Sequence, residues 1–422
     1  MKNYIDVEER LPLLKTIPLS FQHLFAMVGA TILVPMLTGT SPSLALFCSG
    51  VGTILYIICT KGKLPAYIGS SFAFIAPITV ATSQYGVSAM LSGVIGAGVI
   101  YIITAAIIKV LGSEWIDKIL PPVLVGSVVI VIGLGLAGTA VNWAGLNPNY
   151  VDPSMAGVPR NIWILVSVVT LAVGVFGSMY FKGFLGVIPI LISMVVGYVL
   201  SLMLGVIPQE TINAITSAKL FQAPQFTFPT FHWGSIMLMA PVAVVTLAEH
   251  IGHVYVTNNV CNRDFTKEPG LHRSILGDGV ATVFAGLVGG PPNTTYGENI
   301  GVMAITKVYS VWVIGVAAVI AIILSFIGPV AAMISNIPIP VMGGVSILLF
   351  GIIASSGFRV FVENKIDFSK KKNLIVASVV IVLGIGGAVI KIGSLELAGV
   401  ALATLAGIIL NLVLPDISKS ET

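Results

Sequence analysis

Two glutamates stand within strongly apolar stretches of this 422-residue sequence, whereas most other acidic residues fall in its tails or between such stretches. Glu249 lies in the segment VAVVTLAEHIGHVYV and Glu298 lies in TTYGENIGVMA. A charged side chain at the centre of a bilayer costs about 2.5–3.5 kcal/mol even on the lenient insertion scale. Each carboxylate must therefore face a polar cavity, find a partner or take up a proton. That is the chemistry of a substrate or ion path, and the alternative is a hydrogen bond that only holds two helices together.

Two histidines follow Glu249 closely. In a helix, His253 lies one turn beyond Glu249 on the same face, and His250 is rotated about 100° away. A histidine one turn from a buried glutamate suits a proton relay or a partner that orients the carboxylate. A purely structural role for His253 is an equal alternative. No HExxH motif or cysteine accompanies the pair, so we predict that no metal binds there.

Other polar and aromatic residues also fall in apolar stretches. The ring of Phe72, in the segment GSSFAF, could stack on a planar base, although most phenylalanines of membrane proteins face lipid or the core. For Gln22 and His23, a packing hydrogen bond and a role in a site are equally open. The glycines at 133–138 satisfy GxGxxG. They lie within one apolar stretch without a βαβ unit, so close helix packing explains them better than dinucleotide binding.

Composition assigns the chain to the membrane. Hydrophobic residues make up 56% of it and charged residues 9%, and the mean hydropathy is +1.02. A soluble domain carries roughly 25% charged residues, so most of the outer surface must face lipid. No basic cluster is large enough to indicate nucleic acid binding. The three scattered cysteines predict neither a disulfide framework nor a zinc site, and the charged N-terminus lacks the features of a signal peptide.

A helix needs about 20 apolar residues to cross the bilayer core. On this basis we predict fourteen spans, at residues 17–38, 43–60, 66–83, 87–110, 121–140, 161–181, 183–206, 235–257, 271–289, 293–306, 309–333, 338–358, 373–390 and 397–414. The third and the tenth are the weakest helices, because Gly-Ser-Ser at 69–71 and Gly-Gly-Pro-Pro at 289–292 interrupt them.

The basic residues give an independent test of this count, because cytoplasmic loops carry an excess of Lys and Arg. If the N-terminus is cytoplasmic, even-numbered connections are cytoplasmic too. Only Arg160, Lys219 and Lys391, three of the 21 Lys and Arg, then fall on the other side. We therefore expect a multi-pass protein of the cell membrane with both termini in the cytoplasm.

An internal repeat is visible in the glycines and prolines. A Pro-Val pair at 122–123, followed by Gly126 and Gly133, recurs 218 residues later at the start of the twelfth span. Spans five and twelve are seven apart, and an odd-numbered unit reverses its orientation in the membrane when it is repeated. The pattern predicts two inverted halves of seven spans, linked by 207–234, with the interrupted third and tenth spans in matching positions. Such paired interruptions indicate a central binding site.

At several separated places the chain resembles the nucleobase–ascorbate (nucleobase–cation symporter-2) transporters, and among them the bacterial uracil permeases. The family signature is matched in full by Glu-Asn-Ile-Gly-Val-Met-Ala-Ile-Thr-Lys at 298–307. The segments Pro65–Phe74, Ala248–His253 and Pro292–Asn299, together with Gln22-His23, match the uracil-permease pattern. The likeness runs from about residue 11 to the last span. Glu at the first signature position favours uracil-type over purine-type members.

The resemblance implies an all-α polytopic fold in two domains. Residues 1–110 and 235–333 would form a core domain, and 121–206 and 338–414 a gate domain. Spans three and ten would each contain a short strand, and the two strands would pair near the centre of the bilayer. Members of the family are typically homodimers that associate through the gate domain.

The resemblance also implies the residues of the site. Uracil would lie beside the strands, held by Glu249 and Glu298, near Phe72 and Ser71, and contacted by the backbone around Tyr296 and Gly297. His253 would support Glu249 and proton coupling. Supporting positions would be taken by Asn299, Gln22 and His23.

Physical chemistry agrees with that cargo. Uracil is a flat neutral ring with two N–H donors and two carbonyl acceptors, and a pair of glutamates can accept from the former or, once protonated, donate to the latter. A neutral cargo gains nothing from the membrane potential, so uphill import needs a coupled ion, for which we favour the proton and protonation of Glu298. No further cofactor is implied. The alternatives are a purine or xanthine carrier, sodium coupling and, from another class, an intramembrane enzyme with Glu and His as acid and base. An anion channel fits poorly, because the candidate pore is acidic.

Overall fold

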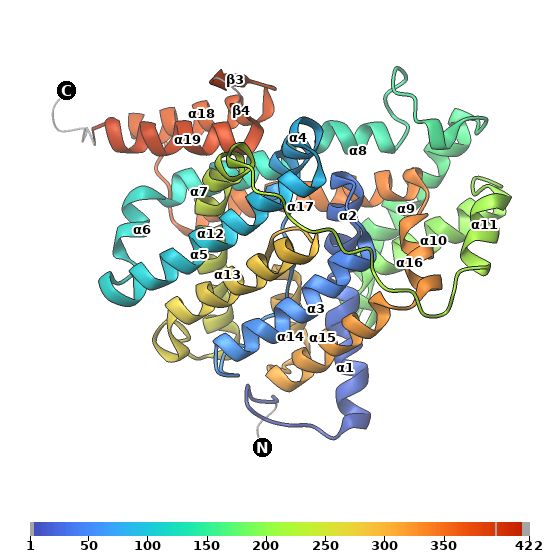
Figure 1. Cartoon of the computed structure of the whole chain (residues 1–422), viewed down its shortest axis with the longest axis horizontal. Coiled ribbons are helices and arrows are strands. Elements are labelled where there is room, and N and C mark those ends of the chain that lie inside the picture. The colour runs from blue at the N-terminus through green and yellow to red at the C-terminus, as the bar shows by residue number, and fades with distance from the viewer. Residues whose placement is uncertain (1–3, 393–394, 416–422) are drawn as a thin grey trace.

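The computed structural model describes residues 4–392 and 395–415, and helices dominate it (Figure 1). Its first half contains α1 (Leu13–Ala26), α2 (Val28–Thr38), α3 (Pro42–Cys59), β1 (Ile68–Ser70), η1 (Phe72–Phe74), α4 (Ile75–Tyr85), α5 (Val87–Leu111), α6 (Glu114–Ile119), α7 (Pro122–Leu134), α8 (Ala137–Trp143), η2 (Pro153–Met155), α9 (Arg160–Tyr180), η3 (Leu185–Val187), α10 (Pro189–Met203) and α11 (Gln209–Thr216).

The second half repeats the pattern of long helices and one interrupted stretch. It contains α12 (Trp233–Cys261), η4 (Thr266–Gly270), α13 (Leu271–Val288), β2 (Asn293–Thr295), α14 (Gly297–Thr306), α15 (Val311–Ser325), α16 (Gly328–Ser335), α17 (Ile339–Glu363), α18 (Lys371–Ile385), β3 (Val389–Ile392), β4 (Leu395–Ala398) and α19 (Gly399–Val413).

Within the described residues, six helices are long and apolar enough to cross a membrane, and a seventh span results if α1 and α2 are counted together. Those two helices meet at a bend of 40°. Three shorter apolar helices, α10, α15 and α19, have 10–17 residues each. Several of the fourteen predicted spans are thus built from short or broken pieces, as in α15 followed by α16. The exact number of spans stays a prediction.

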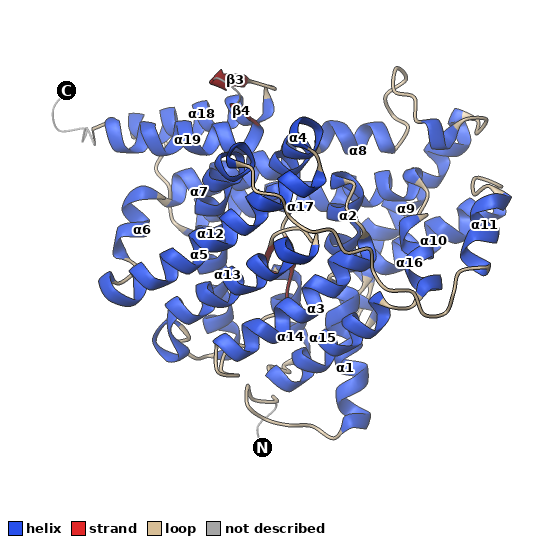
Figure 2. Ribbon diagram, in the orientation of Figure 1, coloured by secondary structure: helices blue, strands red, loops and turns tan. Residues whose placement is uncertain are grey.

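Two short strands lie in the interrupted segments. β1 and β2 pair antiparallel, with Ile68 opposite Thr295 and Ser70 opposite Asn293. Figure 2 shows this pair inside the molecule, among helices. Just beyond the strands, the backbone N–H of Ser71 donates to Pro292 O at 3.0 Å and that of Tyr296 donates to Tyr67 O at 3.0 Å.

One threonine from a neighbouring helix forms hydrogen bonds with the outer edge of each strand. The hydroxyl of Thr53 in α3 accepts from Ile68 N at 3.1 Å and lies 3.3 Å from Ile68 O. In the same way, the hydroxyl of Thr282 in α13 accepts from Asn293 N at 3.2 Å and donates to Asn293 O at 3.1 Å. A non-helical backbone in an apolar interior needs partners for its N–H and C=O groups, and these two threonines supply them symmetrically.

A second pair of strands was not predicted. β3 and β4 form an antiparallel hairpin, with Val389 opposite Ala398, between α18 and α19. It falls where the thirteenth predicted span ends and the fourteenth begins, so residues 389–390 belong to β3 and not to a helix. Figure 1 shows it at the periphery, away from the other strands.

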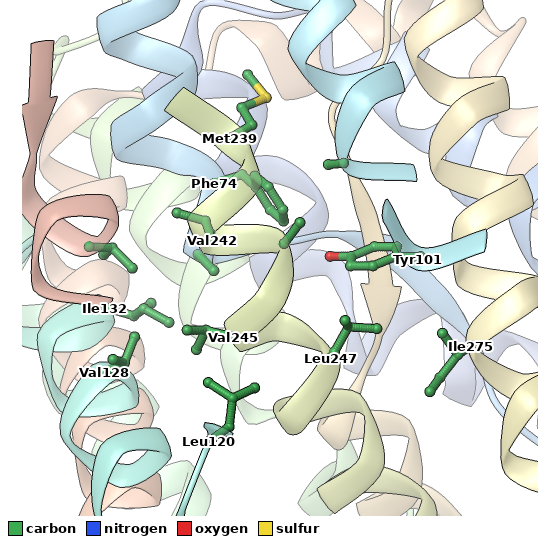
Figure 3. Close-up of a cluster of buried hydrophobic side chains, with 14 of the residues drawn as sticks. Phe74, Tyr101, Leu120, Val128, Ile132, Met239, Val242, Val245, Leu247 and Ile275 are labelled. Carbon is green, nitrogen blue, oxygen red and sulfur yellow. The ribbon is translucent and has the colours of Figure 1, made fainter. Parts of the chain in front are cut away.

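α12 runs between two groups of helices. Figure 3 shows Val245 of α12 facing Ile132 of α7 on one side, and Leu247 beside Tyr101 of α5 and Ile275 of α13 on the other; all five side chains are buried. The hydroxyl of Tyr101 bonds to Thr246 of α12. This apolar packing fixes the rotation of α12 about its axis, and so the direction in which its polar residues point.

Glycines allow the closest helix crossings. A methyl group at Gly133 would lie 2.5 Å from backbone atoms of Phe350 and Ala354 in α17, so close packing of α7 on α17 requires that glycine. Gly138, at the end of the GxGxxG pattern, has no such neighbour within 4 Å. The packing interpretation therefore holds for the first glycine of that pattern and not for the last.

Candidate functional site

Glu249 and Glu298 come from different elements that meet beside the strand pair. Glu249 lies in the middle of α12, and Glu298 in the first turn of α14, directly after β2. The charges of Glu298 and Asp278 both act on the Glu249 carboxylate. Glu249 is half-buried and Glu298 is exposed, and no side chain in the described part of the chain forms a hydrogen bond or ion pair with either. Each of the two carboxylates thus keeps accessible surface and has no side-chain partner in the described part of the chain.

Two helix N-termini lie at the two ends of the strand pair. α14 begins at Gly297 and η1 begins at Phe72, each immediately after one of the strands, and neither has a side-chain cap. The first N–H groups of a helix have no partner within the helix, so they can donate to a carbonyl of a bound molecule. Carboxylate acceptors and backbone donors together can bind the edge of a neutral ring that carries both N–H and C=O groups.

The side chain of Tyr296 is turned towards β1. It is buried, and its hydroxyl donates to Ser70 O at 3.1 Å. A methyl group at Gly69 would lie 2.7 Å from the Tyr296 ring, so a glycine is required where the ring crosses the strand. Tyr296 therefore fixes the two strands against each other, and only its backbone remains to contact a ligand.

His253 lies against the start of α14. Its Nδ1 is 2.9 Å from Thr295 Oγ1 in β2, and a methyl group at Gly297 would lie 3.2 Å from its Nε2. The hydrogen bond of His253 thus goes to the strand rather than to Glu249, one turn before it. The second ring nitrogen faces the backbone next to Glu298.

A buried network behind the site was missed in the sequence. Nδ1 of His250 is 2.7 Å from Oδ2 of Asp278 in α13, and Nε2 of His250 is 2.6 Å from the hydroxyl of Ser274. The Tyr56 hydroxyl in α3 lies 2.6 Å from the same oxygen. The side chains of His250 and Asp278 are 2% and 4% exposed, so this ion pair is enclosed, unlike the two glutamates. Asp278 is an acid within the apolar stretch of α13, so it carries the same signal in the sequence as Glu249.

Phe72 lies where helices of the two halves meet. Its ring is half-buried and makes an edge-to-face contact with Phe350 of α17, with centroids 6.3 Å apart. It also lines a cavity of about 60 Å³ next to Val131 and Gly399. The neighbouring Ser71 is buried, and its hydroxyl has no partner in the described part of the chain.

The polar residues of the bent first helix contact α14 from the other side. Nδ2 of Asn299 donates to the backbone oxygen of His23 at 3.0 Å and lies 3.2 Å from its Nδ1. Asn299 and His23 are both buried. The Gln22 side-chain oxygen is buried and, among the described residues, has no hydrogen-bond partner. The structure thus brings His23 to the signature segment, while Gln22 makes no such bond.

A larger cavity lies elsewhere. About 330 Å³ in volume, it is lined almost wholly by apolar side chains of α1, α2, α3, α10, α15 and α16, and neither glutamate borders it. A small polar ligand needs convergent polar groups, so the region of Glu249 and Glu298 is the better candidate site despite the larger void. The described residues contain no group of three or more His, Cys, Asp or Glu that could hold a metal ion.

Comparison with known proteins agrees over nearly the whole chain. A sequence model described as Permease family (Xan_ur_permease) matches residues 14–393. The chain is 50% identical over 415 residues to the uracil permease of Paenibacillus larvae, which covers 98% of this chain and 97% of that protein. It is 51% identical over 421 residues to the uracil permease of Bacillus caldolyticus, covering 98% and 95% respectively.

A solved structure has the same fold at low sequence identity. The transmembrane domain of a cyanobacterial bicarbonate transporter, BicA, is similar with a TM-score of 0.66 at 15% identity, covering 97% of this chain and all of that one. The likeness supports a transporter-like arrangement of helices.

Proposed function

The chain belongs to the Permease family, and from this premise we propose that it is a proton-coupled symporter that imports uracil across the cytoplasmic membrane by alternating access. The single observation that carries the proposal is that α12 and α14, which are in contact beside the strand pair, each carry a glutamate with accessible surface and no side-chain partner among the described residues. The chain is about 50% identical to uracil permeases over 98% of its length, which supports uracil as the cargo.

The coarser features need no proposal. A permease-family chain with six or seven apolar spans among its described residues is a multi-pass membrane protein. Its relatives are permeases and not enzymes.

Recognition of uracil would divide between side chains and backbone. The carboxylates of Glu249 and Glu298 would accept from the two ring N–H groups, and the free N–H groups at the starts of η1 and α14 would donate to the two carbonyls. The half-buried ring of Phe72, at the start of η1, would cover one face of the base.

Proton coupling would work through Glu298, which is the more exposed of the two carboxylates. Two carboxylates that share one space repel each other, so uptake of one proton would relieve the repulsion and create a donor for a uracil carbonyl. Loss of that proton towards the cytoplasm would restore the repulsion and weaken binding. His253, whose Nε2 faces Gly297, and Glu249 would take part in the transfer.

We propose that the fourteen spans form two inverted repeats and two domains. Thr53 accepts from the first residue of β1 and Thr282 accepts from the first residue of β2. This equivalence supports the inversion, because the helices of the two threonines are the second and the ninth predicted spans, seven apart. The core would comprise 1–110 and 235–333, and the gate 121–206 and 338–414. The core would rock against the gate, both termini would be cytoplasmic, and two copies would associate through the gate.

Ligand-induced stabilisation of the purified protein in detergent tests the cargo. Uracil at 100 times its Kd should stabilise the fold by about 2.7 kcal/mol and raise the unfolding temperature, whereas xanthine at the same concentration should not. Stabilisation by xanthine alone would favour the purine carrier. Removal of sodium at fixed pH should leave the uracil effect unchanged, and its loss would favour sodium coupling.

A further inference from the structure

The N-terminal segment is hydrogen-bonded along the loop that follows the C-terminal end of α14. We call residues 4–10 the N-terminal strap. Ile5 N donates to Lys307 O, Tyr309 N donates to Ile5 O, and Val311 N donates to Val7 O, each at 2.9 Å. The strap thus runs beside residues 307–311, which connect α14 to α15.

Side chains add to this attachment. Val7 is completely buried. The Ser310 hydroxyl donates to Glu9 O at 2.6 Å, and the Arg10 guanidinium lies 3.7 Å from the centre of the Trp312 ring. The strap therefore belongs to the body of the protein and holds the loop after α14.

Arg263 joins the strap to a second loop, the one that follows α12. Its guanidinium lies 2.8 and 2.9 Å from the two carboxylate oxygens of Glu8, and 3.0 Å from Oδ1 of Asp6. Nη1 donates to both Glu8 oxygens and Nη2 lies against Asp6, so one guanidinium holds two carboxylates of the strap. Such charge-assisted hydrogen bonds are stronger than neutral ones. The hydrogen bond that Arg263 donates to Glu8, with the charges of Glu8 and Asp6, raises the pKa of Arg263, so the cation persists at any physiological pH.

The two loops end the two helices that carry the glutamates. Arg263 is the second residue after α12, and Lys307 follows α14 directly. Both helices end in a left-handed residue, Asn262 with φ 51° and Lys307 with φ 56°. At 1.5 Å per residue, Glu249 is about 18 Å from the end of α12 and Glu298 about 12 Å from the end of α14, so neither loop contacts the site.

We infer that Arg263 is a positioning residue, which through the N-terminal strap ties the end of α12 to the end of α14 and so sets the distance between Glu249 and Glu298. The inference rests on the proposed function for its effect on uracil, but not for the physical link. Without the tie, the two helices are still in contact but are free to shift against each other, and the carboxylates no longer converge on one ring.

Charge reversal and its rescue test the link. We expect Arg263→Glu and Glu8→Arg each to raise the KM for uracil uptake by at least about fivefold, the lower end of typical coupling between sites, with a smaller change in the maximal rate. The double variant Arg263→Glu with Glu8→Arg should restore the KM to within about twofold of the parent. High salt should weaken the parent towards the single variants.

The control is a neighbouring pair that does not contact the strap. Lys267 pairs with Asp264 at 3.3 Å in the same loop and is largely exposed. Lys267→Glu should leave the KM unchanged. Where Arg263→Glu does not accumulate in the membrane, the milder Glu8→Gln takes its place and should raise the KM in the same direction.

Hydrogen exchange separates the inference from the cargo assignment. The amides of Tyr309 and Val311 donate to the strap, so they should exchange faster in Arg263→Glu and regain protection in the double variant. A parent that fails to transport uracil would defeat the proposed function, and the exchange result would still decide the link. An unchanged KM together with unchanged exchange in both single variants, or no rescue in the double variant, would overturn the inference.

Discussion

Glu249 and Asp278 are both carboxylates of apolar helices, yet their surroundings give them different tasks. Asp278 is enclosed with His250, Ser274 and Tyr56, whereas Glu249 and Glu298 keep accessible surface. An enclosed and hydrogen-bonded pair holds a geometry. An open pair without partners among the described residues is ready to bind a ligand or a proton. The site thus consists of an open pair supported by an enclosed one.

Replacement of Glu298 separates binding from coupling. Glu298→Gln keeps an acceptor but cannot gain or lose a proton, so uracil binding should weaken by no more than about tenfold, while uptake loses its dependence on a proton gradient. Glu298→Ala should weaken binding by about 10- to 100-fold, the value of a hydrogen bond to a charged group. Uptake of radiolabelled uracil and binding measurements check both. Glu210→Gln on exposed α11 is the control, and gradient-driven accumulation by Glu298→Ala would contradict the assignment.

Replacement of Asp278 should act first on stability. Asp278→Asn replaces the charged acceptor of His250 with a neutral amide, whose NH2 group adds donors in an enclosed environment. Buried donors without partners cost about 1–3 kcal/mol, so the unfolding temperature of the protein in detergent should fall. Uptake should also fall, because His250 and Glu249 are adjacent on α12. The matched control is Asp117→Asn, an exposed acid of α6. Equal unfolding temperatures for the two variants would show that the Asp278–His250 pair contributes nothing.

At this scale the sequence predicted the exceptional residue types but not their partners. Glu249 and Glu298 were conspicuous because a carboxylate in an apolar stretch is costly. The bond from His253 to Thr295 was not readable, since it depends on how α12 is rotated against β2. That rotation is set by apolar contacts such as those of Val245 and Leu247 (Figure 3).

At the scale of elements, the strand pair decides where the two half-helices begin. Its antiparallel register places the N-termini of η1 and α14 at the two opposite ends of the pair, since Ser70 lies opposite Asn293 and Thr295 opposite Ile68. Thr53 and Thr282 complete its hydrogen bonds. Polar backbone in an apolar interior is stable only when it is so satisfied. The elements that we propose bind the ligand therefore depend on partners in α3 and α13.

A methyl group on β1 tests this dependence. Gly69→Ala would place a carbon 2.7 Å from the Tyr296 ring, and such overpacking costs about 1–3 kcal/mol. The strands should separate, the bond from Tyr296 to Ser70 should weaken, and the Kd for uracil should rise by about tenfold or more. Calorimetric titration with uracil measures this. Gly138→Ala is the control, because a methyl group at Gly138 has no neighbour within 4 Å, and this variant should bind uracil normally. Equal affinities for the two variants would show that the strand pair does not position the binding site.

Interruptions in the sequence were readable and pairings were not. Gly-Ser-Ser at 69–71 and Gly-Gly-Pro-Pro at 289–292 mark the breaks, because glycine and proline do not continue a helix. The antiparallel register, the β3–β4 hairpin and the N-terminal strap all depend on contacts between distant segments. The strap looked like an ordinary charged tail, because no local periodicity marks a segment held by its neighbours.

At the scale of the whole molecule, transport would need the core to move against the gate. Phe72 and Phe350 meet across that boundary at 6.3 Å, and Ala76 of α4 meets Gly399 at the start of α19. Between α12 and α7, the buried side chains of Val245 and Ile132 face each other (Figure 3). Apolar surfaces of this kind can slide without leaving buried polar groups unpaired.

A reversible crosslink tests the movement. The Cβ of a side chain at Gly399 would lie 3.7 Å from that of Ala76, within the range of about 3.5–4.5 Å for a disulfide. Ala76→Cys with Gly399→Cys should transport when reduced, stop when oxidised, and recover with a reductant. Each single cysteine variant should stay active under oxidation, which also controls for Cys48, Cys59 and Cys261. Full activity of the oxidised pair would exclude a movement across this boundary.

The most direct test of the central claim is uptake of radiolabelled uracil into proteoliposomes, with and without an inward proton gradient. We predict accumulation above the external concentration only with the gradient, and its loss on addition of a protonophore. Accumulation that persists with the protonophore present would contradict proton coupling. An absence of uracil uptake under either condition, with uptake of a purine in the same vesicles, would contradict the assignment of the cargo.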